Sequence, residues 1–75
     1  MNKNRRQQLN GLLDGLERIK DELEAVCEEE QDYFDNMPEN LQGSIRGTES
    51  EEAIDAMNDA VSALEDVIST IESIA

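Results

Sequence analysis

The sequence predicts an all-α protein, an antiparallel helical hairpin whose two long helices are coiled-coil-like. Two segments repeat apolar residues at alternating spacings of three and four, as on the buried side of an amphipathic helix. Between them lies the stretch DYFDNMPENLQGSIRG, which contains the only Pro and two of the four Gly residues. A break of this composition ends one helix before the next begins, and antiparallel return is the simplest way to continue the chain.

The first segment predicts one helix from about residue 4 to about residue 35. Asn4 followed by Gln7 resembles a capping box at its start. With Leu9 as heptad position a, every a and d site up to Val26 is aliphatic. The a and d sites are Leu9, Leu12, Leu16, Ile19, Leu23 and Val26, continued by Glu30 and Tyr33. Position e adds Leu13, Cys27 and Phe34, which widen the apolar stripe.

The second segment predicts a helix from about residue 49 to about residue 74. Thr48 followed by Glu51 forms a capping box, and the acids of the first turn favour the positive end of the helix dipole. The a and d sites are Ile54, Met57, Val61, Leu64, Ile68, Ile71 and Ala75. The preceding g sites are Ala53, Ala60, Val67 and Ile74.

The connection covers about residues 36–48. Pro38 disfavours the helical conformation of the residue before it and can open one short helical turn, PENLQ, which Gly43 closes. Antiparallel return brings three bases near the N-terminus toward the C-terminal end of the second helix, where the dipole favours cations. These bases are Lys3, Arg5 and Arg6.

A hairpin of 75 residues forms one domain, 1–75, with a marginal core. Because each apolar stripe is three positions wide, one flank of each helix stays uncovered in a single hairpin. We therefore expect a homodimer, paired as a four-helix bundle. Gly11 and Gly15 either let another backbone approach the first helix closely or mark loosely held early turns.

The charge excludes several classes of partner. Nineteen acidic residues against six basic ones give a net charge of −13 at pH 7. Such a surface repels nucleic acids and anionic lipids, so we expect no direct nucleic-acid binding and no membrane binding, and it attracts basic proteins. A single Cys, the lack of a signal-peptide pattern and the lack of a long apolar run predict a cytoplasmic protein.

No arrangement of residues indicates catalysis, a metal or a cofactor, so we expect a protein that is not an enzyme. The acid run of residues 28–35 lacks the His of di-iron bundles and the spacing of a calcium loop. Glu30 is the one charge on the apolar seam. It is either a general acid–base candidate if buried, or a side chain that reaches water near the hinge. The acids around Cys27 oppose a thiolate, so we expect Cys27 to be an inert thiol in the core.

The connection is richer in apolar and aromatic residues than a plain turn needs. Aromatics, Met and Arg are enriched at binding hot spots, so these residues form a candidate partner-binding surface. Its members are Tyr33, Met37, Leu41, Ile45 and Arg46. One interpretation is that Phe34, Leu41 and Ile45 fold back and plug the open end of the bundle. The other is that Met37 and Arg46 form an exposed docking tip.

The stretch YFDNMPENLQGSIRG, followed by an acidic heptad helix, resembles the small acidic helical proteins of unknown function encoded by tailed phages and prophages of Firmicutes. The resemblance covers nearly the whole chain and is most specific from Tyr33 to Gly47. Ile45 departs from it, because such proteins often have a charged residue there. The resemblance implies a phage accessory protein in the bacterial cytoplasm that binds a host or phage protein, for example inhibiting a host enzyme or defence complex.

Three other functions fit parts of the pattern. A rigid dimeric bundle also suits a structural or assembly component of the virion. An acidic DNA mimic is a second alternative, although the eight acids after Gly47 lie about 4.5 Å apart along the helix against about 1.7 Å per charge in duplex DNA. The third is a phosphate-binding site at Ser44, Arg46 and Gly47, which the net negative charge opposes.

Overall fold

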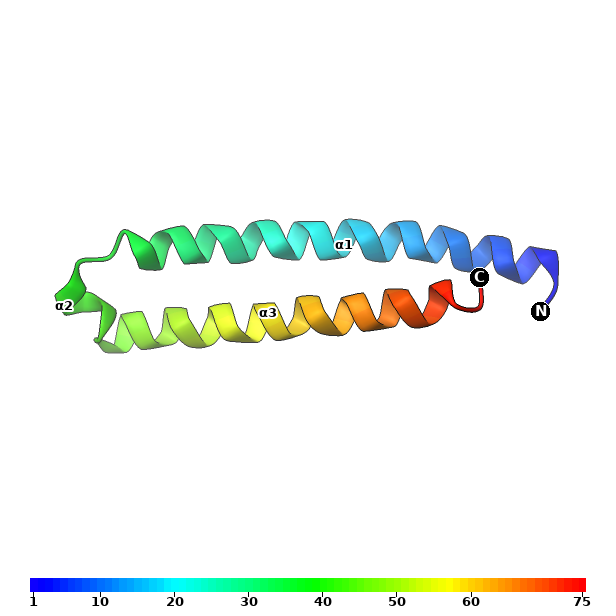
Figure 1. Cartoon of the computed structure of the whole chain (residues 1–75). Coiled ribbons are helices and arrows are strands. Elements are labelled where there is room, and N and C mark those ends of the chain that lie inside the picture. Colours follow the sequence, from blue (N-terminus) through cyan, green and yellow to red (C-terminus); the bar gives the residue numbers. More distant parts are fainter.

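The computed structural model describes residues 1–75 as one extended helical hairpin, whose Cα atoms span 58 × 15 × 12 Å (Figure 1). Helix α1 spans Lys3–Asp35, the short helix α2 spans Glu39–Gln42, and helix α3 spans Ile45–Glu72. The two long helices lie side by side and antiparallel, and α2 forms the hinge between them. The all-α class and the helical hairpin are therefore confirmed. Neither long helix contains an apolar window of the length and hydropathy needed to cross a membrane.

Helix α3 packs on α1 through its predicted a and d sites. Ile54 and Ile68 are buried, and Met57, Val61 and Leu64 are half-buried. These aliphatic side chains recur every three or four residues, so they lie on one side of the helix and shield one another from water.

Helix α1 packs through its a and e sites, whereas the heptad pattern predicts a and d. Leu13, Cys27 and Phe34 at position e are buried or half-buried against α3. The d sites, from Leu12 to Tyr33, are exposed. The reason is that a stripe three positions wide contains two overlapping seams. Both the a–d and the a–e series alternate spacings of three and four, so periodicity cannot distinguish them.

Helix α3 begins at Ile45, earlier than the predicted start near residue 49. Ser44 is its N-cap, and the Gly47 N–H donates to Ser44 Oγ at 3.4 Å. The Thr48 N–H donates to the Ser44 carbonyl at 2.9 Å, so Thr48 lies inside the first turn and does not cap the helix. Ser44 offers the same kind of side-chain acceptor one turn earlier. The start of α1 shifts likewise, because Asn2 Oδ1 accepts from the Arg5 N–H at 2.8 Å.

The hinge is tied to both long helices. Pro38 and Gly43 flank α2, and Gln42 is its last residue. Gln42 Nε2 donates to the carbonyls of Phe34 and Met37, each at 3.2 Å, which satisfies free acceptors at the end of α1. On the other side, the backbone of Gln42 lies against Gly47 of α3. The connection is therefore an ordered corner with its own packing.

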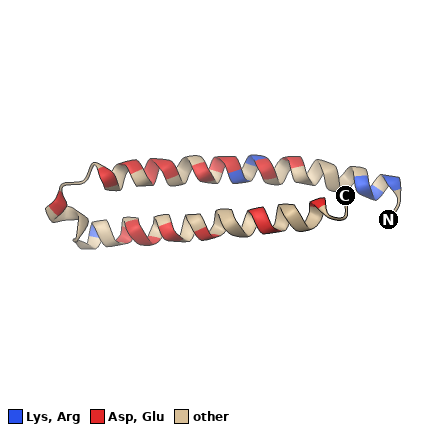
Figure 2. Cartoon of the chain, in the orientation of Figure 1, with Lys and Arg blue, Asp and Glu red and all other residues tan.

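The N-terminal end of α1 projects beyond the end of α3 (Figure 1). Lys3, Arg5 and Arg6 form a basic cluster there, while acids are spread over both long helices (Figure 2). None of the three forms an ion pair with the end of α3. The one ion pair of the structure joins Lys20 Nζ to Glu17 Oε2 at 3.7 Å. Most of the acids are therefore balanced only by solvent ions.

Candidate functional site

The five predicted partner-binding residues divide into two groups. Leu41, Ile45 and Arg46 are exposed at the hinge, and Ile45 is the most exposed large apolar residue at 81%. Tyr33 is also exposed but belongs to the last turns of α1. Met37 is only 8% exposed, so its predicted place in an exposed tip is wrong. It lies between the end of α1 and Pro38, where the chain turns back over the open end of the hairpin.

The plug at the hinge end contains one of the three predicted residues, Phe34, together with Met37. Phe34 is half-buried and Met37 is buried, so these two close the end of the hairpin. Leu41 and Ile45, predicted to fold back, remain exposed. Ile45 occupies heptad position f of α3, on the side of the helix opposite the seam that packs on α1.

The exposed hinge residues are held in place by backbone contacts. The Leu41 N–H donates to the Pro38 carbonyl at 2.8 Å, and the Ser44 hydroxyl donates to the Leu41 carbonyl. Gly47 fixes the start of α3 against Gln42. A surface that is already ordered loses little entropy when a partner binds, so this corner is suited to recognition.

A second surface runs along the length of the hairpin. On α1 it consists of the d residues, which are 48 to 59% exposed and recur every seven positions. On α3 it consists of exposed alanines and two larger aliphatic residues. We call this surface the apolar face; its members are Leu12, Ile19, Val26 and Tyr33 on α1 and Ala53, Ala56, Ala60, Ala63, Val67 and Ile74 on α3.

The two stripes lie on the same side of the hairpin. On α1 each exposed residue comes directly before a residue of the a–e seam, as Val26 precedes Cys27. On α3 each g residue comes directly before a residue of the a–d seam, as Ala53 precedes Ile54. Two antiparallel helices are related by a local two-fold axis normal to their common plane. Equivalent positions therefore lie on one side of that plane, and the stripes form one continuous face.

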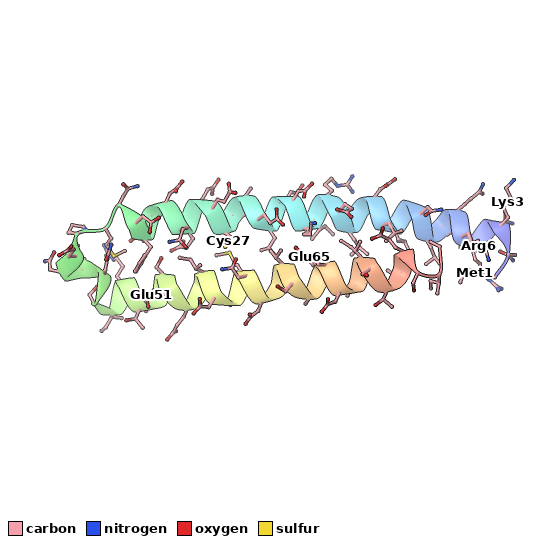
Figure 3. All side chains as sticks on the ribbon, in the orientation of Figure 1. Met1, Lys3, Arg6, Cys27, Glu51 and Glu65 are labelled. Carbon is pink, nitrogen blue, oxygen red and sulfur yellow. The ribbon has the colours of Figure 1, made fainter.

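The opposite side of the hairpin is polar and acidic. An open hollow of about 350 Å³ lies there, lined by Glu24, Cys27, Glu28, Gln31, Asn58 and Val61. The buried Cys27 points into the space between the helices (Figure 3), and its thiol donates to Asn58 Oδ1 at 3.5 Å. No three His, Cys, Asp or Glu side chains come together in the geometry of a metal site.

Glu30 has a hydrogen-bond partner that the sequence analysis did not predict. It is half-buried, and its Oε2 accepts a hydrogen bond of 2.6 Å from the Ser50 hydroxyl of α3. Ser50 is only 3% exposed. The signal for this partner was present, because Ser50 occupies the d position before Ile54. The pair ties the two helices together near the hinge.

A scan of the chain against protein-family models finds no match, and neither do searches of the curated proteins and of the solved structures.

Proposed function

We propose that this chain is a non-enzymatic binding protein that docks on another protein through its exposed hinge end. The docking surface, here called the docking tip, consists of Leu41, Ile45 and Arg46. The observation that carries the proposal is the 81% exposure of Ile45 at an ordered corner. A large aliphatic side chain held in water at a fixed position gains free energy when a partner covers it, by roughly 1.5–3 kcal/mol.

The partner needs an apolar pocket to receive Ile45, and the charge of this chain indicates which residues surround that pocket. The net charge is −13, and Glu39 and Glu49 lie close to the tip in the sequence. A partner with a basic rim around an apolar pocket is attracted by this field and is also favoured once docked. Arg46, the single base near the tip, then fits an acidic group or an aromatic ring within the pocket.

The resemblance of residues 33–47 to small acidic phage proteins adds the biological setting. On that basis we propose a phage accessory protein in the bacterial cytoplasm, with a host enzyme or defence complex as the partner that it inhibits. The absence of a catalytic arrangement in the sequence supports inhibition by occupation of a surface.

Photocrosslinking tests the docking tip directly. A photoreactive phenylalanine analogue at position 45 should crosslink one host protein, which mass spectrometry then identifies. The matched control is the same analogue at position 52, one heptad along the same exposed side of α3. We expect a specific adduct from position 45 and none from position 52. Equal adducts from both positions, or none from position 45, would contradict the proposal.

Substitution then measures the contribution of the tip. We expect Ile45→Ser and Arg46→Gln each to weaken binding to the identified partner about tenfold or more, as hot-spot truncations do. Helix content should be unchanged, because both side chains are exposed. The control Glu52→Ser should bind at full strength. Undiminished binding by both tip variants would instead direct attention to the acidic helix faces.

A further inference from the structure

The residues of the apolar face on α1 are spaced symmetrically about one level of the helix. Its four residues recur every seven positions, so Leu12 and Tyr33 are equidistant from the point between residues 22 and 23. Ile19 and Val26 are equidistant from the same point. A second α1, turned end for end about this point, therefore places Leu12 opposite Tyr33 and Ile19 opposite Val26.

The four alanines of the apolar face on α3 are also spaced symmetrically, about a residue at the same level of the hairpin. Ala53 and Ala63 are equidistant from residue 58, as are Ala56 and Ala60. The Ser50–Glu30 hydrogen bond sets the levels of the two helices relative to each other. Seven or eight residues from that pair, α1 reaches residues 22–23 and α3 reaches residues 57–58. One two-fold axis through this level therefore maps the four α1 residues onto one another and the four alanines of α3 onto one another. Val67 and Ile74 lie outside this symmetric part, at the levels of Glu49 and Gln42 of the second copy.

The end of the face near the N-terminus also has a shape that matches its other end. An open groove of about 440 Å³ lies there, lined by Gly11, Leu12, Gly15, Leu16, Arg18, Ile19 and Ile71. Gly11 and Gly15 form part of its floor and have no side chains to fill it. The space above them is open, since a Cβ on Gly11 would meet nothing within 4 Å and one on Gly15 would meet only the Arg18 side chain. At the opposite end, Tyr33 is an exposed ring. The two-fold axis places that ring at the level of the groove.

We propose that a second copy of this chain covers the apolar face, about a two-fold axis perpendicular to the helices. The two hinges then lie at opposite ends of a four-helix bundle. Tyr33 of each copy enters the glycine-floored groove of the other, so the interface is self-complementary and each contact occurs twice. The alanines let the two α3 helices approach closely. This surface is separate from the docking tip, and the two proposals stand independently.

The α3 part of the apolar face carries no charge that would oppose a second copy. Along the α3 part of the face, no acid or base occupies position g or c from Ala53 to Ile74. Two chains of net charge −13 can therefore meet there without bringing acids of α3 together. At the α1 edge, Arg18 lies within two residues of the level of Glu29 in the second copy, on both sides of the axis. Glu22 of each copy lies within one residue of the level of the other, so one pair of acids meets near the axis.

The need for further burial also favours a second copy. The single hairpin buries only four apolar residues, and none of its side chains is fully buried. A core of this size gives little stability to 75 residues without help from another chain.

The first test is mass. Sedimentation equilibrium at micromolar concentration should give about twice the 8.4 kDa mass of the chain. Gly15→Leu should give the monomer mass, because the new side chain fills the groove that receives Tyr33. Leu is a better helix former than Gly, so loss of the dimer by this variant cannot be attributed to loss of the helix. Gln31→Leu, on the opposite side of α1, is the control and should remain dimeric. A monomeric native chain would overturn the proposal, as would a dimeric Gly15→Leu variant.

The second test is the direction of the axis. Single spin labels are placed on Asn40→Cys and on Glu22→Cys, each combined with Cys27→Ala. With hinges at opposite ends, the distance between labels at residue 40 should approach the 58 Å length of the hairpin, and that between labels at residue 22 should be far shorter. A short distance at residue 40 would mean that both hinges lie at one end, which contradicts the proposed axis.

Discussion

Gly47 of α3 lies directly against the backbone of Gln42 in α2. A Cβ on residue 47 would be 2.5 Å from the Gln42 carbonyl carbon and 2.7 Å from its Cα. No glycine of the chain has a positive φ, so close approach, and not backbone conformation, requires glycine here. Because the Gln42 side chain also bonds to carbonyls at the end of α1, this contact joins the hinge to both long helices.

We expect Gly47→Ala to destabilise the protein by about 1–3 kcal/mol, because backbone atoms must move to admit the methyl group. The midpoint of urea denaturation, followed by circular dichroism, measures the change. Gly43→Ala is the matched control, since nothing lies within 4 Å of its added Cβ. Equal stability of Gly47→Ala and the native protein would show that α2 is not packed on α3.

Ser50→Ala tests the bond between the long helices. We expect a loss of about 1–3 kcal/mol, because the half-buried Glu30 carboxylate loses the donor that lies 2.6 Å away. Ser62→Ala removes an exposed hydroxyl from the same helix and should change the denaturation midpoint little. If both variants behave alike, the hydrogen bond contributes no measurable stability.

Ile68→Asp should unfold the chain at room temperature. Ile68 is the most buried apolar residue at 4% exposure, and an unpaired charge there costs more than a small domain can lose. Far-ultraviolet circular dichroism should show loss of the helical signal. The neighbouring change Ser69→Asp, on the exposed side, should remain helical. A helical Ile68→Asp variant would indicate that the two helices are stable without their shared core.

Added salt should raise the melting temperature. The folded chain gathers 19 acids with only one ion pair among them, so repulsion between carboxylates opposes folding. Salt screens that repulsion over about 10 Å at 0.1 M ionic strength. Thermal melts from low salt to 0.5 M sodium chloride measure the effect. A melting temperature that falls with salt would mean that attractive charge pairs outweigh repulsion.

Cys27 offers a probe of opening between the helices. Its thiol is buried and hydrogen-bonded to Asn58, so we expect slow modification by a thiol reagent in buffer and fast modification in urea. Ser62→Cys, exposed on α3, supplies the rate for an open thiol when combined with Cys27→Ala. If Cys27 reacts as fast as this control in buffer, the hairpin opens readily near its middle.

Much of this fold follows from local sequence. The spacing of the aliphatic residues predicts both long helices, and Pro38 and Gly43 predict the position of the break and of the short helical turn between them. These features depend on neighbours a few residues apart, whose conformations are set by sterics and hydrogen bonds within one turn.

The tertiary structure decided what local spacing leaves open. It selected the seam through Leu13 and Cys27 on α1, which left Leu12 and Ile19 in solvent, and it buried Met37 while exposing Ile45. These outcomes depend on contacts between residues far apart in the chain, such as Glu30 with Ser50 and Cys27 with Asn58. An apolar stripe three positions wide can pack on a partner helix through either of two overlapping series of residues. Only the approach of the second helix makes one of them the core and leaves the other as a surface.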